Sequence, residues 1–521
     1  MNQMEVKRKR FSIISSIIIL LNILVLSGVL GEHGIAYLAG TLECFFFLLV
    51  FTAYTLPEAM ARLMRTRIQK GQGKNAMRVF KAALILGGIY CLIGSVFLQI
   101  CAGFVLDYLF DTVYGSYALS LLIPAYCLLV FVQVLRGFFQ GMGTCIPTGI
   151  SRVIESIILF VTGIFFCFML RKQGEKIAAL LHNDELIASY SSAGVSMGFI
   201  VAELFSVLFL FLVFQTNKRN INKGNNKEAF RMTERYGELI YILIMTMLPS
   251  IAGVFLSRAD ILGGIILFRF MDRDISNGIG IYGAFYGKYL TIVLLCVLFI
   301  RLTVVKVEGH IQNAYRKNEY KSGREWIATG SHMVLLAGLF MSVIIAVLGN
   351  SLLNILFKDN SGNAGSMLMS GSSLILFMAL GAFFSNALIS QGKIKRVLLN
   401  QLGGVVIFFA YAIISNGLWQ NGIDRIVTGL CISNGFVMFS AFLMCIRLAK
   451  WKNEWIINVV IPIGCAALTG IIVMLLDKAL VTITGAVASV LICLCVGVVV
   501  YGVLLLAFRA IREEEFEVIP G

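Results

Sequence analysis

Residues 133–155 read QVLRGFFQGMGTCIPTGISRVIE, and this stretch joins two strongly apolar runs through a short connector from Gly141 to Pro147. It carries five charged or amide side chains: Gln133, Arg136, Gln140, Arg152 and Glu155. On a helix Gln133, Arg136 and Gln140 lie at positions i, i+3 and i+7, which places them on one face. An ionised group at the centre of a bilayer costs at least about 2.5 kcal/mol, so we expect this face to point toward a water-filled cavity or a protein partner.

Apolar runs of this kind extend along the whole chain. Of its 521 residues, 59% are hydrophobic and 14% are charged, and its mean hydropathy is +0.88, whereas soluble domains carry about 25% charged residues. A membrane-spanning helix needs roughly 20 apolar residues. The apolar windows predict an all-α integral membrane protein with about 14 spans, centred near residues 21, 46, 93, 127, 158, 203, 248, 291, 340, 376, 407, 436, 465 and 494.

The distribution of basic residues predicts the orientation of the chain. The formal charge is +15, but the Lys and Arg residues lie in short gaps between apolar segments. That distribution argues against a nucleic-acid partner, which requires a basic soluble surface. Most of the 43 Lys and Arg residues fall on one side of the predicted spans. By the positive-inside rule we expect both termini to be cytoplasmic and the basic loops to contact membrane lipids.

Two parts of the chain repeat at nearly the same offset. The segment that begins at Leu119 matches the segment that begins at Leu368 in pattern, and the basic connector around Lys74 matches the one around Lys321. The offsets are 249 and 247 residues. Since an even number of spans separates the matched elements, we expect a parallel repeat. The predicted organisation is a six-helix lobe over residues 1–230, a second six-helix lobe over 231–450, and an extra helix pair with a cytoplasmic tail over 451–521.

The chain resembles the multidrug/oligosaccharidyl-lipid/polysaccharide (MOP) exporter superfamily. The residues that carry the resemblance are LGEHGIAYLAG (30–40), LPEAMARLMRTRIQKGQGKNAMRVF (56–80), LRGFFQGMGTCIPTGISRVIE (135–155) and ALISQGKIKRVLLNQLGGVV (387–406). Within the superfamily it is most similar to the branch of stage V sporulation protein B and the polysaccharide biosynthesis flippases. The chain departs from that branch in lacking an arginine in its first span.

The resemblance implies a flippase or exporter that moves a lipid-linked oligosaccharide or polysaccharide precursor across the bacterial cytoplasmic membrane. It implies alternating access by two lobes around a central hydrated cavity. A drug/cation antiporter of the MATE type is the alternative within the superfamily. Oligomeric state stays open, and a monomer is plausible.

An enzyme of the same pathways is a further alternative, but we expect no enzyme activity. Neither a Walker A sequence nor HExxH occurs in the chain, and no nucleophile and base cluster is visible. We therefore expect no cofactor and no metal site. We expect transport to be driven by H⁺, Na⁺ or the membrane potential. The longest outer loop, about residues 171–189, is short for a catalytic domain.

Polar residues inside the predicted spans are the candidate site residues. Candidates for the substrate cavity are Gln133, Arg136, Gln140, Arg152, Glu155, Arg258 and Lys288, and candidates for ion coupling are Asp260, Glu43 and Glu203. Asp260 is preferred because the family often has an acidic residue in this helix. Two readings of Arg136 stay open, a contact for an anionic head group and a side chain that snorkels to the cytoplasmic interface. Arg152 and Glu155, at i and i+3, could pair with each other.

Overall fold

The computed structural model describes residues 3–108, 113–225, 233–271, 278–357, 363–415, 422–449 and 456–510. Within these residues the backbone forms helices and tight turns, without a strand. The chain divides into two compact units, Asn2–Arg258 and Ala259–Gly521. The predicted all-α class is confirmed. The predicted lobe boundary at residue 230 lies outside the described residues.

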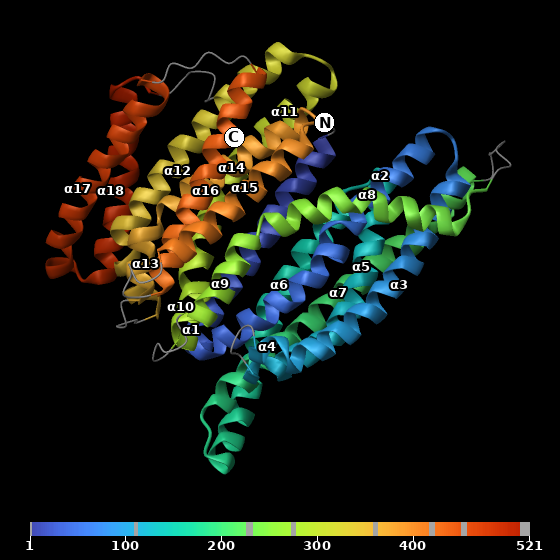
Figure 1. The fold of residues 1–521 in the computed structure, drawn as a ribbon, viewed down its shortest axis with the longest axis horizontal. Coiled ribbons are helices and arrows are strands. Elements are labelled where there is room, and N and C mark those ends of the chain that lie inside the picture. The colour runs from blue at the N-terminus through green and yellow to red at the C-terminus, as the bar shows by residue number, and fades with distance from the viewer. Residues whose placement is uncertain are drawn as a thin grey trace. The chain divides into compact units, whose positions relative to one another are not determined.

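The first unit contains eight α-helices in its described part, several of them longer than a bilayer requires (Figure 1). They are α1 (Gln3–Leu49), α2 (Leu56–Gln69), α3 (Gly73–Gly103), α4 (Val105–Tyr108), α5 (Ser116–Gly141), α6 (Ile146–Leu181), α7 (Glu185–Asn225) and α8 (Tyr236–Leu256). A π-helical turn, Val50–Tyr54, separates α1 from α2, and a 3-10 turn, Val113–Gly115, precedes α5. Leu92, Ile93, Val96 and Ile100 of α3 are exposed, as expected for a helix that faces lipid.

The described residues contain 13 helical stretches long and apolar enough to cross a membrane. All of the predicted span centres fall inside them, and the first stretch, Val6–Gln69, contains two centres, near residues 21 and 46. Between these two centres α1 bends at Gly31, whose φ of 71° lies in the left-handed region that glycine adopts without a steric penalty. The prediction of about 14 spans is therefore confirmed.

Small residues set the distance between α6 and α7, which form a long antiparallel hairpin. A side-chain carbon at Gly198 would lie 2.6 Å from the Gly163 Cα, and one at Gly194 would lie 2.8 Å from the Cys167 Cα. Glycine is therefore required wherever the two backbones touch. Gly194 and Gly198, four residues apart, thus lie on the face of α7 that packs closely on α6.

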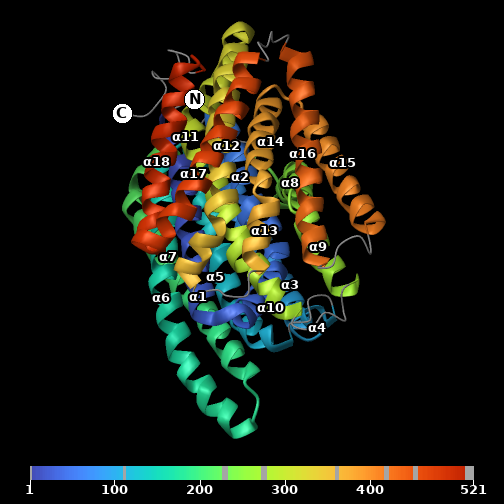
Figure 2. The same ribbon diagram turned by 90° about the vertical axis from the view of Figure 1, so that its left-hand side faces the viewer.

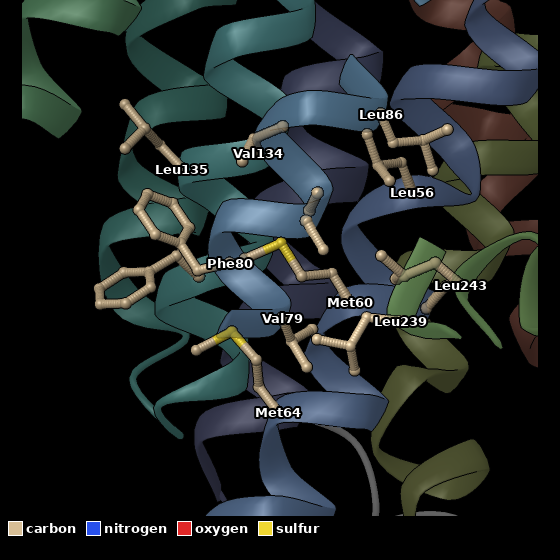
Figure 3. Packing of buried hydrophobic residues seen from close by; sticks show 14 of the residues in the cluster. Leu56, Met60, Met64, Val79, Phe80, Leu86, Val134, Leu135, Leu239 and Leu243 are labelled. Atoms are coloured by element: carbon tan, nitrogen blue, oxygen red, sulfur yellow. The ribbon is translucent and has the colours of Figure 1, made fainter. Parts of the chain in front are cut away.

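Helix α8 packs with the helices of the first unit, although it follows the long basic connector after α7. Leu239 and Leu243 of α8 lie against Met60 of α2 and Val79 of α3 (Figure 3). These side chains belong to one buried hydrophobic cluster that also includes Phe138 of α5. Since transmembrane helices associate through van der Waals packing, the close packing of this cluster explains why the unit extends to Arg258.

The second unit contains the remaining helices (Figure 1). They are α9 (Ala259–Met271), α10 (Gly278–Ala284), α11 (Thr291–Arg316), α12 (Tyr320–Phe357), α13 (Asn363–Gly371), α14 (Ser373–Ser390), α15 (Ile394–Ile414), α16 (Gly422–Ala449), α17 (Ile461–Thr484) and α18 (Ala486–Ala507). π-Helical turns, Phe285–Leu290 and Ile456–Val460, precede α11 and α17. Figure 2 shows α15 and α16 side by side.

Helices α17 and α18 form the predicted extra pair and pack along α12. Tyr501 of α18 stacks on Phe340 of α12 and donates a hydrogen bond to the Leu336 carbonyl oxygen at 3.0 Å. Cys465 of α17 is buried in the same cluster as Leu339 of α12. The pair is thus fixed to one helix of the second unit. Residues 450–455 before it and the tail after residue 510 lie outside the described residues.

The internal repeat is visible in the backbone of two turns. Gly143, between α5 and α6, has φ of 85°, and Gly392, between α14 and α15, has φ of 77°. After Gly143, Thr144 N donates to the Phe139 carbonyl at 3.0 Å, and Lys393 N donates to the Leu388 carbonyl at 3.0 Å in the second turn. Each of these residues has its counterpart 249 positions later, so the same helix-ending motif recurs at the predicted offset.

The second pair of turns repeats at the other predicted offset. Gly71, between α2 and α3, has φ of 71°, and Asn318, between α11 and α12, has φ of 62°. The two residues are 247 positions apart, and asparagine is among the few residues with a side chain that tolerate this conformation. Together the two pairs confirm the predicted duplication at the level of backbone geometry.

Candidate functional site

Three helices of the first unit contribute polar side chains to one buried cluster. The turn at Gly143 reverses the chain, and Pro147 stands in the first turn of α6, where its missing N–H is not needed. As a result Ser151 and Glu155 of α6 return alongside Arg136 of α5. We call Arg136, Ser151, Arg152, Glu155 and Glu203 the arginine–glutamate cluster.

Arg136 is the centre of this cluster. Its Nε donates to Ser151 Oγ at 2.9 Å, and its Nη2 lies 2.5 Å from Glu155 Oε2. The Arg136 side chain is 2% exposed and that of Glu155 is 19% exposed. A buried ion pair of this kind requires close geometry to offset its desolvation. The guanidinium therefore points into the helix bundle, and does not extend toward lipid head groups.

Arg152 pairs differently from the sequence-based expectation. Its Nη1 donates to Ser12 Oγ of α1 at 2.5 Å, and Ser15 Oγ donates to the Arg152 carbonyl at 2.9 Å. The expected pair of Arg152 with Glu155 is wrong, because the Glu155 carboxylate is bound to Arg136. Arg152 turns toward α1 and ties that helix to α6. Serines 12 and 15 were not recognised from the sequence, since a hydroxyl in an apolar run gives no signal of its own.

Glu203 of α7 completes the cluster. It is 1% exposed, and Glu155 and Arg136 are the charged groups that face it. Its Oε2 receives no hydrogen bond from the residues that the structure describes, and the same holds for Gln133 Oε1 on α5. Ser192, Ser196 and Ser206 are buried on the same helix, so buried polar side chains extend along α7 on both sides of Glu203.

Gln140 lies at the end of α5, away from the other members of its face. Arg8 Nη1 of α1 donates to Gln140 Oε1 at 2.7 Å, and Arg65 Nε of α2 donates to the Gln140 carbonyl at 2.9 Å. Cations are favourable at the negative end of a helix dipole. Gln140 thus fixes the C-terminal end of α5 to Arg8 and Arg65. The sequence predicted only that these basic residues belong to the cytoplasmic side.

Glu43 and Arg258, two candidates 215 residues apart, form a second ion pair in the first unit. Arg258 Nη2 lies 3.1 Å from Glu43 Oε1, and the guanidinium stands 4.6 Å from the centre of the Phe46 ring. Glu43 is 1% exposed and the Arg258 side chain is 27% exposed. The acid is thus inaccessible, whereas its partner reaches the surface of the unit.

Asp260 occupies a separate polar site in the second unit, at the start of α9. Its Oδ2 accepts hydrogen bonds from Asn434 Nδ2 at 3.0 Å and from Ser433 Oγ at 3.4 Å, both on α16. The Ile261 N–H donates to Oδ1 at 2.9 Å. Asp260 is 7% exposed, and no Lys or Arg in the described residues forms an ion pair with it. Neutral donors alone surround this carboxyl group.

Lys288 lies on the π-helical turn that precedes α11. It is 5% exposed, and its Nζ stands 5.4 Å from the centre of the Phe357 ring. Glu308 and Asn386 form another polar pair in this unit. The sequence did not predict it, because Glu308 lies at the start of the basic connector around Lys321. Asn386 Nδ2 of α14 donates to Glu308 Oε1 of α11 at 2.9 Å, and Glu308 is 7% exposed.

Glu58 and Arg62, four residues apart on α2, form an exposed ion pair with a separation of 2.7 Å. Across the described ranges, no group of three or more His, Cys, Asp or Glu side chains is placed to hold a metal ion. The twelve cysteines are all free. The polar sites can therefore be described by hydrogen bonds and ion pairs alone.

The internal repeat shows that the charged cluster is not a requirement of the fold. At the offset of 249 residues, Arg136 corresponds to Ser385 and Glu155 corresponds to Gly404. The second half forms the same turn and the same helix pair without the charges. A buried ion pair is seldom retained for stability alone, so the cluster is a candidate for function.

Comparisons with known proteins agree with this architecture. A family model described as "Polysaccharide biosynthesis protein" matches residues 11–306. Stage V sporulation protein B of Bacillus subtilis strain 168 is 21% identical over 538 aligned residues, which cover 96% of this chain and 93% of that protein.

Two solved structures share the fold. An inward-facing multidrug resistance MATE family transporter of the MOP superfamily has a TM-score of 0.65 and 15% identity, covering 86% of this chain and 99% of its own. The lipid II flippase MurJ in an inward closed conformation has a TM-score of 0.65 and 13% identity, covering 96% of this chain and 98% of its own. The resemblance to the MOP superfamily is confirmed, and because the family model spans more than half of the sequence, this chain belongs to the polysaccharide biosynthesis protein family.

Proposed function

We propose that this multi-pass membrane protein is a flippase for a lipid-linked oligosaccharide or polysaccharide precursor in the bacterial cytoplasmic membrane. Family membership over residues 11–306 is the observation that carries the proposal. The named relatives and structural neighbours are a sporulation protein, a transporter and a flippase. None of them is named as an enzyme, in agreement with the expectation of no enzyme activity.

The polar clusters give this proposal a physical basis. A sugar-phosphate head group cannot cross hydrocarbon unaided, because burying unpaired charge costs many kcal/mol, on the order of tens for an isolated ion. Arg136 and Arg152 supply guanidinium groups, which bind phosphate oxygens through paired donors. In the proposed mechanism the head group displaces the internal partners of these arginines while the lipid tail stays in the membrane.

We further propose that the two halves alternate in opening to either side, with both termini cytoplasmic. Asp260 is the preferred residue for ion coupling in the second unit, because its carboxyl group has neutral donors and no cationic partner among the described residues. A drug/cation antiporter of the MATE type is the second candidate, supported by the MATE structure that shares the fold. The flippase would move a substrate with an anionic head group, whereas the antiporter would move a cation.

Reconstituted transport distinguishes them. Purified protein in proteoliposomes is tested for flipping of a fluorescent lipid-linked oligosaccharide, and separately for uptake of an organic cation. We expect flipping by the wild type and a loss of at least about tenfold in Arg136→Ala and Asp260→Ala, equivalent to about 1.4 kcal/mol. Arg136→Lys retains the charge but not the paired donors. Its flipping rate should therefore lie between the rates of the wild type and of Arg136→Ala.

Arg62→Ala is the matched control, because Arg62 is an exposed arginine of the same unit paired only with Glu58. It should flip at the wild-type rate. Unchanged rates in both Arg136→Ala and Asp260→Ala would remove these residues from the mechanism. Cation uptake without flipping would favour the antiporter, and sugar transfer by the purified protein would favour an enzyme.

A further inference from the structure

We infer that Glu155 and Glu203 form a proton-binding site in which the two carboxyl groups share one proton. This inference deepens the proposed function, since it names the coupling ion and its residues in the first unit. It rests on the packing of α6 against α7, on the hydrogen bonds of the neighbouring arginines and on the burial of Glu203.

Helix packing brings the two acids together. Gly198 of α7 is in backbone contact with Gly163 of α6, and Ser206 Oγ of α7 lies 3.5 Å from the Ser151 carbonyl oxygen. Glu203 and Glu155 lie between these two contacts on their respective antiparallel helices. The register of the hairpin therefore places Glu203 of α7 opposite Glu155 of α6.

The hydrogen bonds of the neighbouring guanidiniums go to groups other than Glu203. Arg136 of α5 donates to Ser151 and Glu155, and Arg152 of α6 donates to Ser12 of α1. No described residue donates a hydrogen bond to Glu203 Oε2. The other charged or titratable groups that face this region are Arg8 of α1 and Tyr54 of the turn before α2, both on the side of Arg152. The Arg136 guanidinium thus donates its hydrogen bond to Glu155, whereas it acts on Glu203 only through the proximity of its charge.

A proton shared by Glu155 and Glu203 removes the repulsion between their carboxylates. Two ionised carboxylates in contact repel strongly in a medium of low dielectric constant, and such pairs hold one proton between them. With the proton in place, one carboxyl O–H donates to the other group while Glu155 Oε2 still accepts from Arg136. Glu155 is partly exposed and Glu203 is not, so the proton exchanges with water through Glu155.

Loss of the proton changes the electrostatic balance of a site to which three helices contribute. It adds a negative charge beside Arg136 and Arg152, and Arg152 is the residue that ties α6 to α1 through Ser12. A second carboxylate can then compete for these guanidiniums. The site thus connects proton occupancy to the contact between α6 and α1, which is a means of coupling a proton gradient to movement of helices.

Infrared difference spectroscopy of the protein in lipid nanodiscs, recorded across a pH titration, tests the site without any transport assay. The wild type should show the C=O stretching band of a buried protonated carboxyl group that titrates with pH. The band should vanish in Glu203→Gln, and in Glu155→Gln it should shift in frequency and in titration midpoint, since the remaining acid no longer shares its proton with a second carboxyl group. It should remain in Glu43→Gln and Asp260→Asn, which alter two other buried acids.

A band that survives in Glu203→Gln, that is unaltered in Glu155→Gln, or that is absent from the wild type overturns the shared proton. Glutamine keeps the size of each side chain and can donate to the remaining carboxylate, and a wild-type unfolding temperature in each variant verifies the fold. In proteoliposomes a transmembrane pH gradient should change the flipping rate of the wild type but not of Glu203→Gln. Flipping that ignores the gradient contradicts coupling at this site, whereas a titrating band without flipping contradicts only the proposed function.

Discussion

Arg67 of α2 and Glu234, just before α8, form an ion pair in which Arg67 Nε and Nη2 both lie 2.8 Å from Glu234 Oε2. The Arg67 side chain is 10% exposed and that of Glu234 is 32% exposed. Asn75 Oδ1 accepts from the Glu234 N–H at 3.3 Å, and Arg78 donates to the Glu234 carbonyl. The basic turn between α2 and α3 thus holds the start of α8 on the first unit.

A double-mutant cycle measures this pair. Arg67→Ala and Glu234→Ala should show a coupling energy of about 1 kcal/mol or more, because the arginine is largely buried and both nitrogens bind one oxygen. The exposed pair Glu58 and Arg62 is the control and should couple by about 0.3–0.5 kcal/mol. The measurement is thermal unfolding of the four proteins of each cycle in the same detergent. Equal coupling in the two cycles would contradict the prediction.

The left-handed glycines of the repeated turns lead to a prediction about the free energy of unfolding. Gly143→Ala and Gly392→Ala should each destabilise the protein by about 1 kcal/mol, because a side chain in the left-handed region is strained. No atom lies within 4 Å of the added carbon at either site, so the effect is one of backbone conformation alone. Gly88→Ala inside α3 has the same open space and an ordinary φ. It should be neutral or stabilising by comparison.

Close packing of α6 and α7 predicts a larger effect at Gly198. An added methyl group would lie 2.6 Å from the Gly163 Cα, and a backbone cannot move aside as a side chain can. Gly198→Ala should therefore cost about 1–3 kcal/mol in unfolding free energy. Gly502→Ala on α18, where nothing lies within 4 Å, is the matched control. An unfolding temperature of Gly198→Ala equal to that of the control would show that the hairpin separates easily.

Replacement of Glu43 and replacement of Arg258 should lower the free energy of unfolding by different amounts. Arg258→Met leaves the Glu43 carboxylate, 1% exposed, without its cationic partner, whereas Glu43→Gln leaves an arginine that is 27% exposed and can reach solvent. Removal of one partner of a buried pair costs about 3–5 kcal/mol, and we expect that range for Arg258→Met only. Thermal unfolding compares the two variants. A greater loss in Glu43→Gln would reverse this account.

Much of the architecture could be predicted from local patterns. Apolar windows of span length gave the helices around residues 93, 127 and 494, because a helix that crosses hydrocarbon must be apolar whatever its neighbours are. The matched segments at Leu119 and Leu368 predicted the duplication. The turns at Gly143 and Gly392 then confirmed it, since a helix end with a left-handed residue is a local property of the chain.

The candidate site was predicted only in part. The spacing of Gln133, Arg136 and Gln140 placed them on one helix face, but Gln140 contacts Arg8 at the helix end while Arg136 contacts Glu155 in the interior. The i, i+3 spacing of Arg152 and Glu155 suggested a pair that the structure does not form. Nothing in the sequence pattern connects Glu43 with Arg258, because their separation in the chain leaves no local signal.

The amino-acid sequence by itself determined which segments are helices, where the chain turns and that its two halves repeat. These features depend on the chemistry of hydrocarbon and on short-range backbone geometry. The tertiary structure alone decided that Arg136 bonds Glu155, that Arg152 bonds Ser12 and that Glu203 meets Glu155. Such choices depend on the rotation and register of packed helices, and glycine contacts between distant segments, as at Gly163 and Gly198, set that register.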